Sequence, residues 1–332
     1  MDTSPRMTAP TARLANLDLN LLVSLRELLR ERNVTRAAAR IGISQPAASA
    51  ALSRLRRHFD DELLARRPGG YVLTPLAAQL VDQVEGVCSA AERLFDTGHR
   101  FDPATARRGF TLLVADYTIA VLGPALSSAL AARAPGVELR LRLVRESFSA
   151  DIGETIRLID GMIAPHAIRF ERPELRSTGL FSDRWVCVVD ASHPSAAAGA
   201  LTLDELAAMP WVVPFAPDRG MSASAPMTRQ LNRLGLEPEI RVRVESYLSV
   251  PYLVVGTDRV ALLQERLARQ VADRLGLAVL ACPGEPGPIA ERLWWHSDLD
   301  ADPAHRWFRD LIVEVAGTVE QCPLSRHYLS GR

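Results

Sequence analysis

A group of hydrogen-bonding side chains near the amino terminus has the composition needed to bind DNA. Gln45, Ser49 and Arg56 fall on one face of a predicted helix, with Arg54 beside them. Glutamine and arginine can hydrogen-bond to base edges in the major groove, and serine can reach phosphate oxygens. Their spacing predicts that this helix enters the major groove.

The helix that carries these side chains is the second half of a predicted helix-turn-helix. Thr35 is expected to cap a short helix over residues 36–41, and Gly42 to end it in a left-handed conformation. Ser44 then caps the next helix, and Pro46 is tolerated because first-turn amides have no helical partner. This arrangement is typical of a DNA-binding helix pair. An ordinary helical hairpin is the alternative.

Positive charge is concentrated in the same part of the chain. The whole chain is neutral, yet residues 1–75 contain twelve arginines and seven acidic residues. Residues 32–58 contain six arginines and no acidic residue. A local basic surface on a neutral protein indicates an anionic partner for one part only. A solvated helix face is the alternative that charge alone leaves open.

A turn and a long helix follow this motif. Residues 68–70, Pro-Gly-Gly, separate two short predicted strands and place Arg66 near the tip of a β-wing. The helix that begins after Thr74 has apolar residues at steps of four and three, as in a coiled-coil seam. These residues are Leu76, Leu80, Val84, Val87, Ala91 and Leu94. We expect this helix to mediate dimerisation; packing against its own domain is the alternative.

Beyond residue 108 the pattern changes to alternating strands and helices, which predicts an α/β fold with largely parallel sheets. In open α/β sheets, ligands bind beyond the carboxyl ends of the strands. The candidates at such positions combine aromatic rings, hydroxyls and one carboxylate, as a small-molecule cleft requires. They are Tyr117, Thr118, Asp183, Phe215, Ser246 and Tyr247. For each one singly, ordinary packing is the alternative.

Several classes of protein are disfavoured by what the sequence lacks. The cysteines, at positions 88, 187, 282 and 322, form no C-x-x-C pair, which argues against a zinc site or a redox dithiol. The first sixteen residues lack a signal-peptide core, and no run approaches the ~18 apolar residues of a membrane span. No G-x-S-x-G, phosphate-binding glycine loop or H-E-x-x-H is present. We expect a cytoplasmic protein that is not an enzyme and needs neither cofactor nor metal.

The stretch NVTRAAARIGISQPAASAALSRLR closely resembles the amino-terminal domain of LysR-type transcriptional regulators. The preceding LDLNLL is similar to the branch that contains nodulation and aromatic-degradation regulators. Further along, DRWVCVVDASHP and VPYLVVGTDRVALLQERLA resemble the effector domain of the same family, which is similar to periplasmic binding proteins. The resemblance implies a mainly α winged helix-turn-helix, a long linker helix and an α/β effector domain of two lobes.

The resemblance also implies boundaries for these parts. We expect a disordered tail over residues 1–16, the winged helix-turn-helix over 17–74, the linker helix over 75–98 and the effector domain over 108–320. Within the effector domain, lobe I is expected at about 108–180 and 285–320, and lobe II at about 181–284.

A sequence-specific transcriptional regulator, controlled by a small-molecule effector with aromatic compounds among the candidates, is the function that the resemblance implies. Gln45, Pro46 and Ser49 match the family's DNA-facing positions, and Arg66 lies in the wing. The implied partners are double-stranded promoter DNA, the effector, further copies of the chain in a homodimer or homotetramer, and RNA polymerase, without a membrane. A ligand-independent architectural DNA-binding protein is the alternative.

Two departures from the family limit what can be carried over. Ala50 stands where many members have a basic residue, so their DNA preference does not transfer. Asp183 stands where the related branch often has histidine. A carboxylate there would repel an anionic aromatic acid, which argues against a salicylate-type effector.

Overall fold

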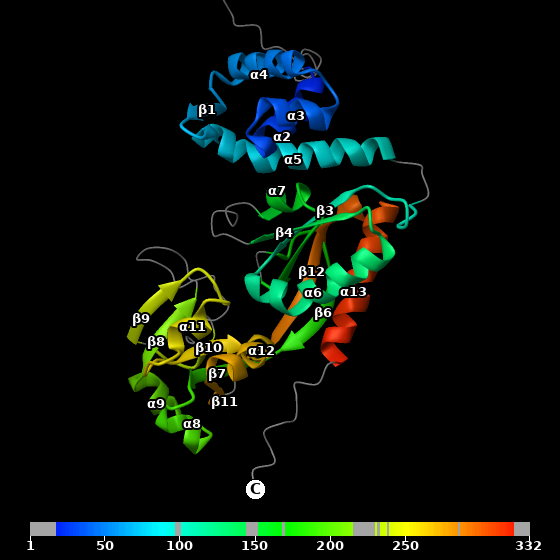
Figure 1. The fold of residues 1–332 in the computed structure, drawn as a ribbon. Coiled ribbons are helices and arrows are strands. Elements are labelled where there is room, and N and C mark those ends of the chain that lie inside the picture. Colours follow the sequence, from blue (N-terminus) through cyan, green and yellow to red (C-terminus); the bar gives the residue numbers. More distant parts are fainter. Residues whose placement is uncertain are drawn as a thin grey trace, which may run out of the picture. The chain divides into compact units, whose positions relative to one another are not determined.

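The computed structural model describes residues 18–96, 101–143, 152–167, 170–214, 230, 233–237, 239–284 and 286–321. Contacts within the chain divide it into two compact units, residues 1–99 and residues 100–332. Each unit is described by itself, and Figure 1 labels its elements.

The first unit is mainly helical and carries one hairpin. Its elements are α2 (Asn20–Glu31), α3 (Val34–Ile41), α4 (Gln45–Phe59), β1 (Leu64–Arg67), β2 (Gly70–Leu73) and α5 (Pro75–Asp96). Strands β1 and β2 pair antiparallel, with Arg67 opposite Gly70 at the turn. A small core of leucines from α2, α4 and β1 joins these elements, with Leu28 and Leu64 fully enclosed. This arrangement is the expected winged helix-turn-helix.

The turn between α3 and α4 has the predicted glycine and serine caps, but the predicted threonine cap is wrong. Gly42 adopts φ +79° at the end of α3, and Ser44 Oγ accepts a hydrogen bond of 3.3 Å from a first-turn amide of α4. Asn33, rather than Thr35, caps α3, accepting a 3.0 Å hydrogen bond from the amide of Arg36. Asn33 has the extended backbone that an N-cap requires, whereas Thr35 already lies inside the helix.

One lobe of the second unit is built on a five-stranded sheet of order β4-β3-β5-β12-β6. Its elements are β3 (Gly109–Val114), α6 (Asp116–Arg133), β4 (Glu138–Leu143), α7 (Ile152–Arg157), β5 (Gly161–Pro165), β6 (Leu175–Asp183), β12 (Ile289–His296), η3 (Ser297–Leu299) and α13 (Pro303–Gln321). Helix α13 contacts both α6 and β6, and Phe308 of α13 stacks on Phe110 of β3. We call this part lobe I.

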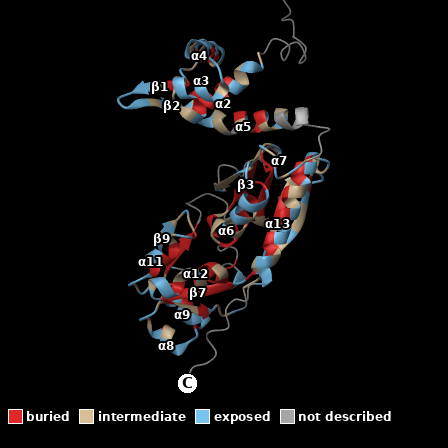
Figure 2. Cartoon of the chain, turned by 45° about the vertical axis from the view of Figure 1, so that its right-hand side comes forward, coloured by how far each residue is buried: buried red, intermediate tan, exposed pale blue. Residues whose placement is uncertain are grey.

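The other lobe, lobe II, contains a three-stranded sheet of order β10-β7-β11 and a two-stranded sheet of β8 and β9. Its elements are β7 (Trp185–Asp190), α8 (Pro194–Ala198), α9 (Leu203–Ala208), β8 (Pro210–Pro214), β9 (Glu239–Val244), α11 (Val250–Val254), β10 (Ala261–Gln264), α12 (Glu265–Leu275) and β11 (Leu277–Ala281). The chain crosses between the lobes where only Arg184 separates β6 from β7, and it returns between β11 and β12. Strand β3 of lobe I and strand β7 of lobe II, each flanked by strands on both sides, are buried (Figure 2).

The expectation of largely parallel sheets is wrong in detail. Strand β3 is parallel to β4 and β5, and β8 is parallel to β9. However, β12 is antiparallel to β5 and β6, and β7 is antiparallel to β10 and β11. In lobe I the cause is the second crossing, because β12 returns from lobe II and joins the sheet against the direction of β5 and β6.

Among the described helices, none has the length and hydropathy that crossing a membrane requires. The described residues also contain no group of three or more histidine, cysteine, aspartate or glutamate side chains placed to hold a metal ion.

Candidate DNA-binding surface and effector site

The predicted recognition helix, α4, separates a buried face from a polar one. Ala48, Leu52 and Leu55 are buried on the inner face. Gln45 and Pro46 are exposed in the first turn, and Gln45 Nε2 lies 3.4 Å from Ser49 Oγ. Thr35, on α3, is also exposed. The side chains predicted to read DNA are therefore accessible, and the amide of Gln45 has only one weak internal partner to give up.

The arginines near α4 divide into those with internal partners and those without. Arg54 forms an ion pair of 2.9 Å with Asp18. Arg56 donates to the carbonyl oxygens of Glu62 and Leu64, at 2.8 and 2.9 Å. Arg56, which was predicted to contact DNA, thus connects α4 to the start of the wing, and this contact alone accounts for its position.

Three exposed arginines on α4 and β1 remain available to a phosphate backbone. Arg57 on α4, and Arg66 and Arg67 on β1, have no acidic partner among the described residues. An exposed guanidinium without an internal partner can form charge-assisted, bidentate bonds to phosphate. Arg66 was identified from the sequence, whereas Arg57 and Arg67 were not among the predicted site residues.

The linker helix α5 packs on its own unit along part of the predicted seam. Thr74 caps it, accepting a 3.1 Å hydrogen bond from the amide of Ala77. Val84 is 5% exposed in the small core, and Leu80 packs against that core. Val87, one turn away from Val84, is 47% exposed. Leu80 and Val84 therefore stabilise the monomeric unit, and Val87 is the seam residue whose apolar side chain is left uncovered.

The other predicted seam residues are neither fully buried nor clearly exposed in the described part of α5. Leu76 and Ala91 are half-buried, and Leu94 has a side chain outside the described part of α5. The sequence could not separate the two uses of the seam because a helix that packs on its own domain and one that pairs with a partner show the same apolar spacing.

In the second unit, two of the predicted ligand-binding residues meet directly at the crossing between the lobes. Tyr117 Oη, from α6, donates a 2.6 Å hydrogen bond to Asp183 Oδ2 at the end of β6. Asp183 also accepts from the backbone amides of Arg184, at 2.8 Å, and Arg266, at 3.3 Å. Because Arg266 belongs to α12 of lobe II, this carboxylate joins three segments of both lobes.

A second carboxylate connects the lobes beside the first. Asp116, the residue before Tyr117, accepts hydrogen bonds from Ser246 Oγ at 2.7 Å and from the amides of Tyr247 and Leu248 at 3.2 and 3.1 Å. Ser246 and Tyr247, both predicted ligand-binding residues, are thus brought to the same place as Tyr117. Asp116 was not among the ligand-binding residues predicted from the sequence.

Of the remaining two predicted ligand-binding residues, only Thr118 belongs to the described part of the chain, and it lies apart from this contact. Thr118 is buried and lines a small cavity with the apolar side chains of Leu112 and Leu122, inside lobe I. Its hydroxyl has no hydrogen-bond partner among the described residues. Phe215 lies outside the described residues.

We call the residues that meet between the lobes, Asp116, Tyr117, Asp183, Ser246, Tyr247 and the nearby Glu291, the interlobe group. Glu291 was not predicted from the sequence. It lies on β12, is 4% exposed, and leaves Oε2 without a hydrogen-bond partner among the described atoms. Burial and the nearby charge of Asp183 raise the pKa of Glu291 to about 8. The available signal was its position between the apolar Ile289 and Leu293 at a spacing of two, which places it on a buried strand face.

Burial shifts the pKa values of Tyr117 and Asp183, as it does that of Glu291, towards the neutral forms. Burial raises the pKa of Asp183, although the hydrogen bond from Tyr117 opposes this. Burial, followed by the charges of Asp183 and Glu291, raises the pKa of Tyr117 well above its ordinary value. Tyr117 therefore remains a protonated phenol and donates a hydrogen bond to the carboxyl group of Asp183.

A salt-bridge cluster reinforces the crossing. Glu265, fully buried at the start of α12, binds the guanidinium groups of Arg184 and Arg269, the latter at 2.7 Å. Burial tends to raise the pKa of Glu265, but the two guanidinium groups outweigh it and leave the pKa below its ordinary value. The buried carboxylate of Glu265 thus has two guanidinium partners.

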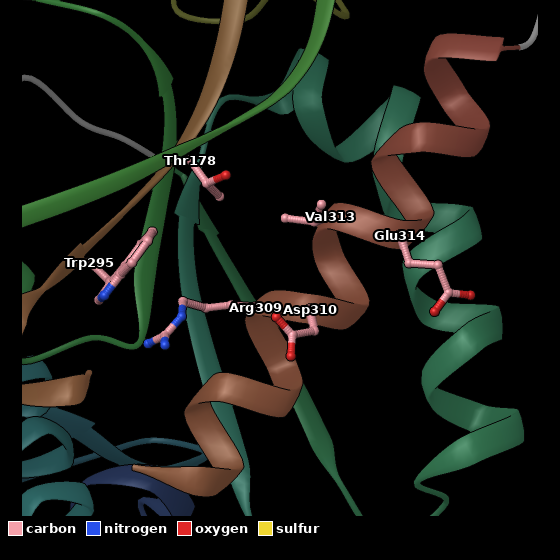
Figure 3. Close-up of a pocket in the computed structure, with 6 residues that line it drawn as sticks. All are labelled: Thr178, Trp295, Arg309, Asp310, Val313 and Glu314. Atoms are coloured by element: carbon pink, nitrogen blue, oxygen red, sulfur yellow. The ribbon is translucent and has the colours of Figure 1, made fainter. Parts of the chain in front are cut away.

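A groove of about 510 Å³ lies elsewhere, on lobe I at β6, β12 and α13 (Figure 3). It is lined by Thr178, Trp295, Arg309, Asp310, Val313 and Glu314. The guanidinium carbon of Arg309 lies 4.6 Å from the ring centre of Trp295, and Glu314 accepts a 2.7 Å hydrogen bond from Arg133 of α6. Its main polar side chains therefore already have partners, and it shares no residue with the interlobe group.

The fold, the exposed face of α4 and the interlobe group define a class of protein: a DNA-binding helix-turn-helix protein with a two-lobed α/β domain. Matches to family models agree with this class. Residues 19–78 match the bacterial regulatory helix-turn-helix protein, lysR family, and residues 105–317 match the LysR substrate binding domain.

Similar proteins extend the match along the chain. The chain is 34% identical over 314 residues to the HTH-type transcriptional regulator SyrM of Rhizobium meliloti (strain 1021), covering 92% of this chain and 91% of SyrM. It is 30% identical over 309 residues to the HTH-type transcriptional activator NagR of Ralstonia sp, covering 91% and 98%. The crystal structure of the probable transcriptional regulator PA0477 from Pseudomonas aeruginosa aligns with a TM-score of 0.70 and 32% identity, covering 90% of this chain and 97% of that one.

The chain belongs to the LysR family of bacterial transcriptional regulators. It is a DNA-binding regulator with an effector-binding domain, and the expected fold, family and function are confirmed. The architectural alternative is disfavoured because it gives no reason for a domain of the substrate-binding type over residues 105–317.

Proposed function

We propose that this protein regulates promoters by placing α4 in the major groove of a defined DNA site. The observation that carries the proposal is the accessible polar face of α4, with Gln45 exposed beside Ser49, in a match to the family's helix-turn-helix. Gln45, Pro46 and Ser49 face base edges and the nearby backbone, with Ser44 and Thr35 at the adjoining helix ends. Arg66 contacts the phosphate backbone, together with Arg57 and Arg67.

The protein acts as a homodimer or homotetramer in this proposal. Two recognition helices about one DNA turn, ~34 Å, apart require a dimer. The exposed side chain of Val87 on α5 supports a contact on that side of the helix. Binding to promoter DNA also implies a location in the cytoplasm and contact with RNA polymerase, and no catalytic role is proposed.

We place the effector at the interlobe group, near Tyr117, Asp183, Ser246 and Tyr247. The support is that residues distant in the sequence, from both lobes, converge there with aromatic, hydroxyl and carboxylate groups. Aromatic compounds are one candidate class. Because these groups already hold hydrogen bonds, Tyr117 to Asp183 and Ser246 and Tyr247 to Asp116, an effector has to replace some of them, and lobe geometry changes as it does so.

The proposed domain boundaries follow the sequence expectation. The winged helix-turn-helix occupies residues 17–74, the linker helix 75–98 and the effector domain 108–320. The division into units at residues 99 and 100 and the extent of α5 support this proposal.

Selection of genomic fragments by the purified full-length protein, followed by footprinting, tests the proposal. We expect a small set of protected sites upstream of genes, with protection extending over two half-sites. Uniform retention of fragments, without protected sites, would contradict it. A reporter driven by a selected site then tests the effector: a response to one compound of a small-molecule panel supports the effector site, and a flat response to the whole panel counts against it.

A further inference from the structure

The carboxylate of Asp116 is placed as a ligand would be. Asp116 is 7% exposed and accepts hydrogen bonds from one hydroxyl and two amides of residues 246–248, in lobe II, as well as from the amide of Tyr117 at 2.9 Å. No arginine pairs with it among the described residues. The donors that hold it are neutral groups fixed by the backbone.

Such a set of donors binds carboxylates in general, because hydrogen bonds to an ionised acceptor are short and strong. A carboxylate that belongs to the chain competes with a free one at a high effective concentration, of millimolar order or above. While Asp116 occupies these donors, a free carboxylate cannot use them. Ser249 supports the same turn, since its hydroxyl and amide both donate to Ser246 Oγ, at 3.0 and 3.1 Å.

We propose that Asp116 is an internal ligand: it fills a carboxylate-binding site of lobe II, fastens the two lobes together without an effector, and excludes anionic effectors from the interlobe group. The proposal rests on the proposed effector site for its regulatory meaning, but not for the contact itself. The natural effector is then neutral or cationic where it meets the start of α6.

The surrounding charges strengthen the exclusion. Tyr117, the next residue, donates a hydrogen bond to Asp183, so a second carboxyl group faces the same region. An anionic effector would bring further negative charge next to the carboxyl groups of Asp116 and Asp183, in a buried region. A hydroxyl or an amine would instead meet acceptors that are already in place.

An ordinary structural role, in which Asp116 only orders the turn at residues 246–249, is the rival explanation. Both roles predict that removing Asp116 destabilises the domain. They differ in what restores it: an emptied carboxylate site accepts a small free carboxylate, whereas a disordered turn does not.

The test is chemical rescue of full-length Asp116→Ala, with Asp116→Asn as the matched control. Thermal unfolding is followed in sodium formate, acetate or chloride at equal ionic strength, over roughly 10–200 mM, where a few hydrogen bonds can hold a small anion. We expect Asp116→Ala to unfold at least about 5 °C below wild type. Formate should recover most of this loss in a saturable manner, acetate less, and chloride none. Wild type and Asp116→Asn, whose side chains fill the site, should respond to formate as they do to chloride.

Three results would overturn the proposal: an Asp116→Ala variant as stable as wild type, equal effects of formate and chloride on that variant, or equal stabilisation of wild type by formate. If Asp116→Ala does not fold in chloride, refolding yields in formate and chloride are compared. Recovery in formate alone supports the proposal, and failure in both contradicts it. The readout uses neither DNA nor effector, so its failure leaves the proposed function standing.

Discussion

The two units of this protein present their functional groups in opposite ways. In the DNA-binding unit, the side chains proposed to contact DNA are exposed, apart from the half-buried Ser49, and residues close to them in the sequence hold them in place. In the effector unit, the proposed groups are buried, and their partners are distant: Tyr117 and Asp183 are 66 positions apart, and Asp116 and Ser246 are 130 apart. Changes in the first unit should therefore alter binding with little effect on folding, whereas changes in the second should alter folding as well.

The largest expected effect is on the folding stability of the DNA-binding unit. It concerns α5, which has both a buried and an exposed apolar side chain. Val84→Asp places a carboxylate in the small core and should destabilise the DNA-binding unit by about 3–5 kcal/mol. Val87→Asp, the matched control one turn away, alters an exposed position and should leave the thermal unfolding temperature unchanged while weakening self-association. Circular dichroism and analytical ultracentrifugation provide the two readouts. Equal unfolding of both variants, or a Val87→Asp chain that associates like wild type, would show that α5 does not have these two faces.

A second expected effect is the pH dependence of folding stability that the buried Glu291 of the effector unit causes. Because the pKa of Glu291 is about 8 when folded and near 4.5 when unfolded, the folded state holds a proton that the unfolded state releases between these pH values. This contribution to folding stability is therefore complete below pH ~4.5, falls as pH rises towards 8, and is lost above it. Glu291→Gln should remove the fall.

Chemical denaturation at pH 4.5 and pH 8.5 measures this. We expect Glu291→Gln to equal wild type at the lower pH and to exceed it by on the order of 3 kcal/mol at the higher pH. Subtracting wild type from the variant cancels the carboxyl groups that do not interact with Glu291. A difference that does not change with pH would mean that Glu291 is ionised in the folded protein throughout.

A third, smaller effect concerns the contact between Tyr117 and Asp183. Tyr117→Phe leaves a buried carboxylate oxygen with only the longer bond from the Arg266 amide, and should cost about 1–3 kcal/mol of folding stability. Tyr252→Phe makes the same chemical change at a tyrosine that is 66% exposed, and should cost nothing measurable. Urea denaturation compares the two, and an equal effect of both substitutions would argue against the interlobe contact.

The same contrast explains what the sequence could predict. The caps at Gly42 and Ser44, the wing and the exposed face of α4 depend on neighbours a few residues away, so local spacing was sufficient. The N-cap of α3 was predicted two positions too late, at Thr35 instead of Asn33, because both residue types can cap a helix.

The interlobe group could be predicted only in part. Tyr117, Asp183, Ser246 and Tyr247 were found because strand ends mark ligand sites, but their pairing depends on the crossing of β6 into β7 and the return of β12. Neither crossing has a local signature. Glu291 was missed for the same reason, since its neighbour Asp183 is supplied by another strand of the sheet. The strand directions were mispredicted because alternating helices and strands do not reveal which strand enters a sheet from the other lobe.

Operator discrimination by Gln45 tests the central claim most directly. Binding of wild type, Gln45→Ala and Arg66→Ala to a selected site and to random DNA is titrated at one salt concentration. Gln45→Ala should lower the ratio of specific to random binding by about 1 kcal/mol or slightly more, roughly fivefold to tenfold, because a base contact is lost. Arg66→Ala should weaken both kinds of binding alike and keep the ratio, because it removes a phosphate contact. If Gln45→Ala keeps the wild-type ratio while the protein stays folded, α4 does not read the DNA sequence through Gln45.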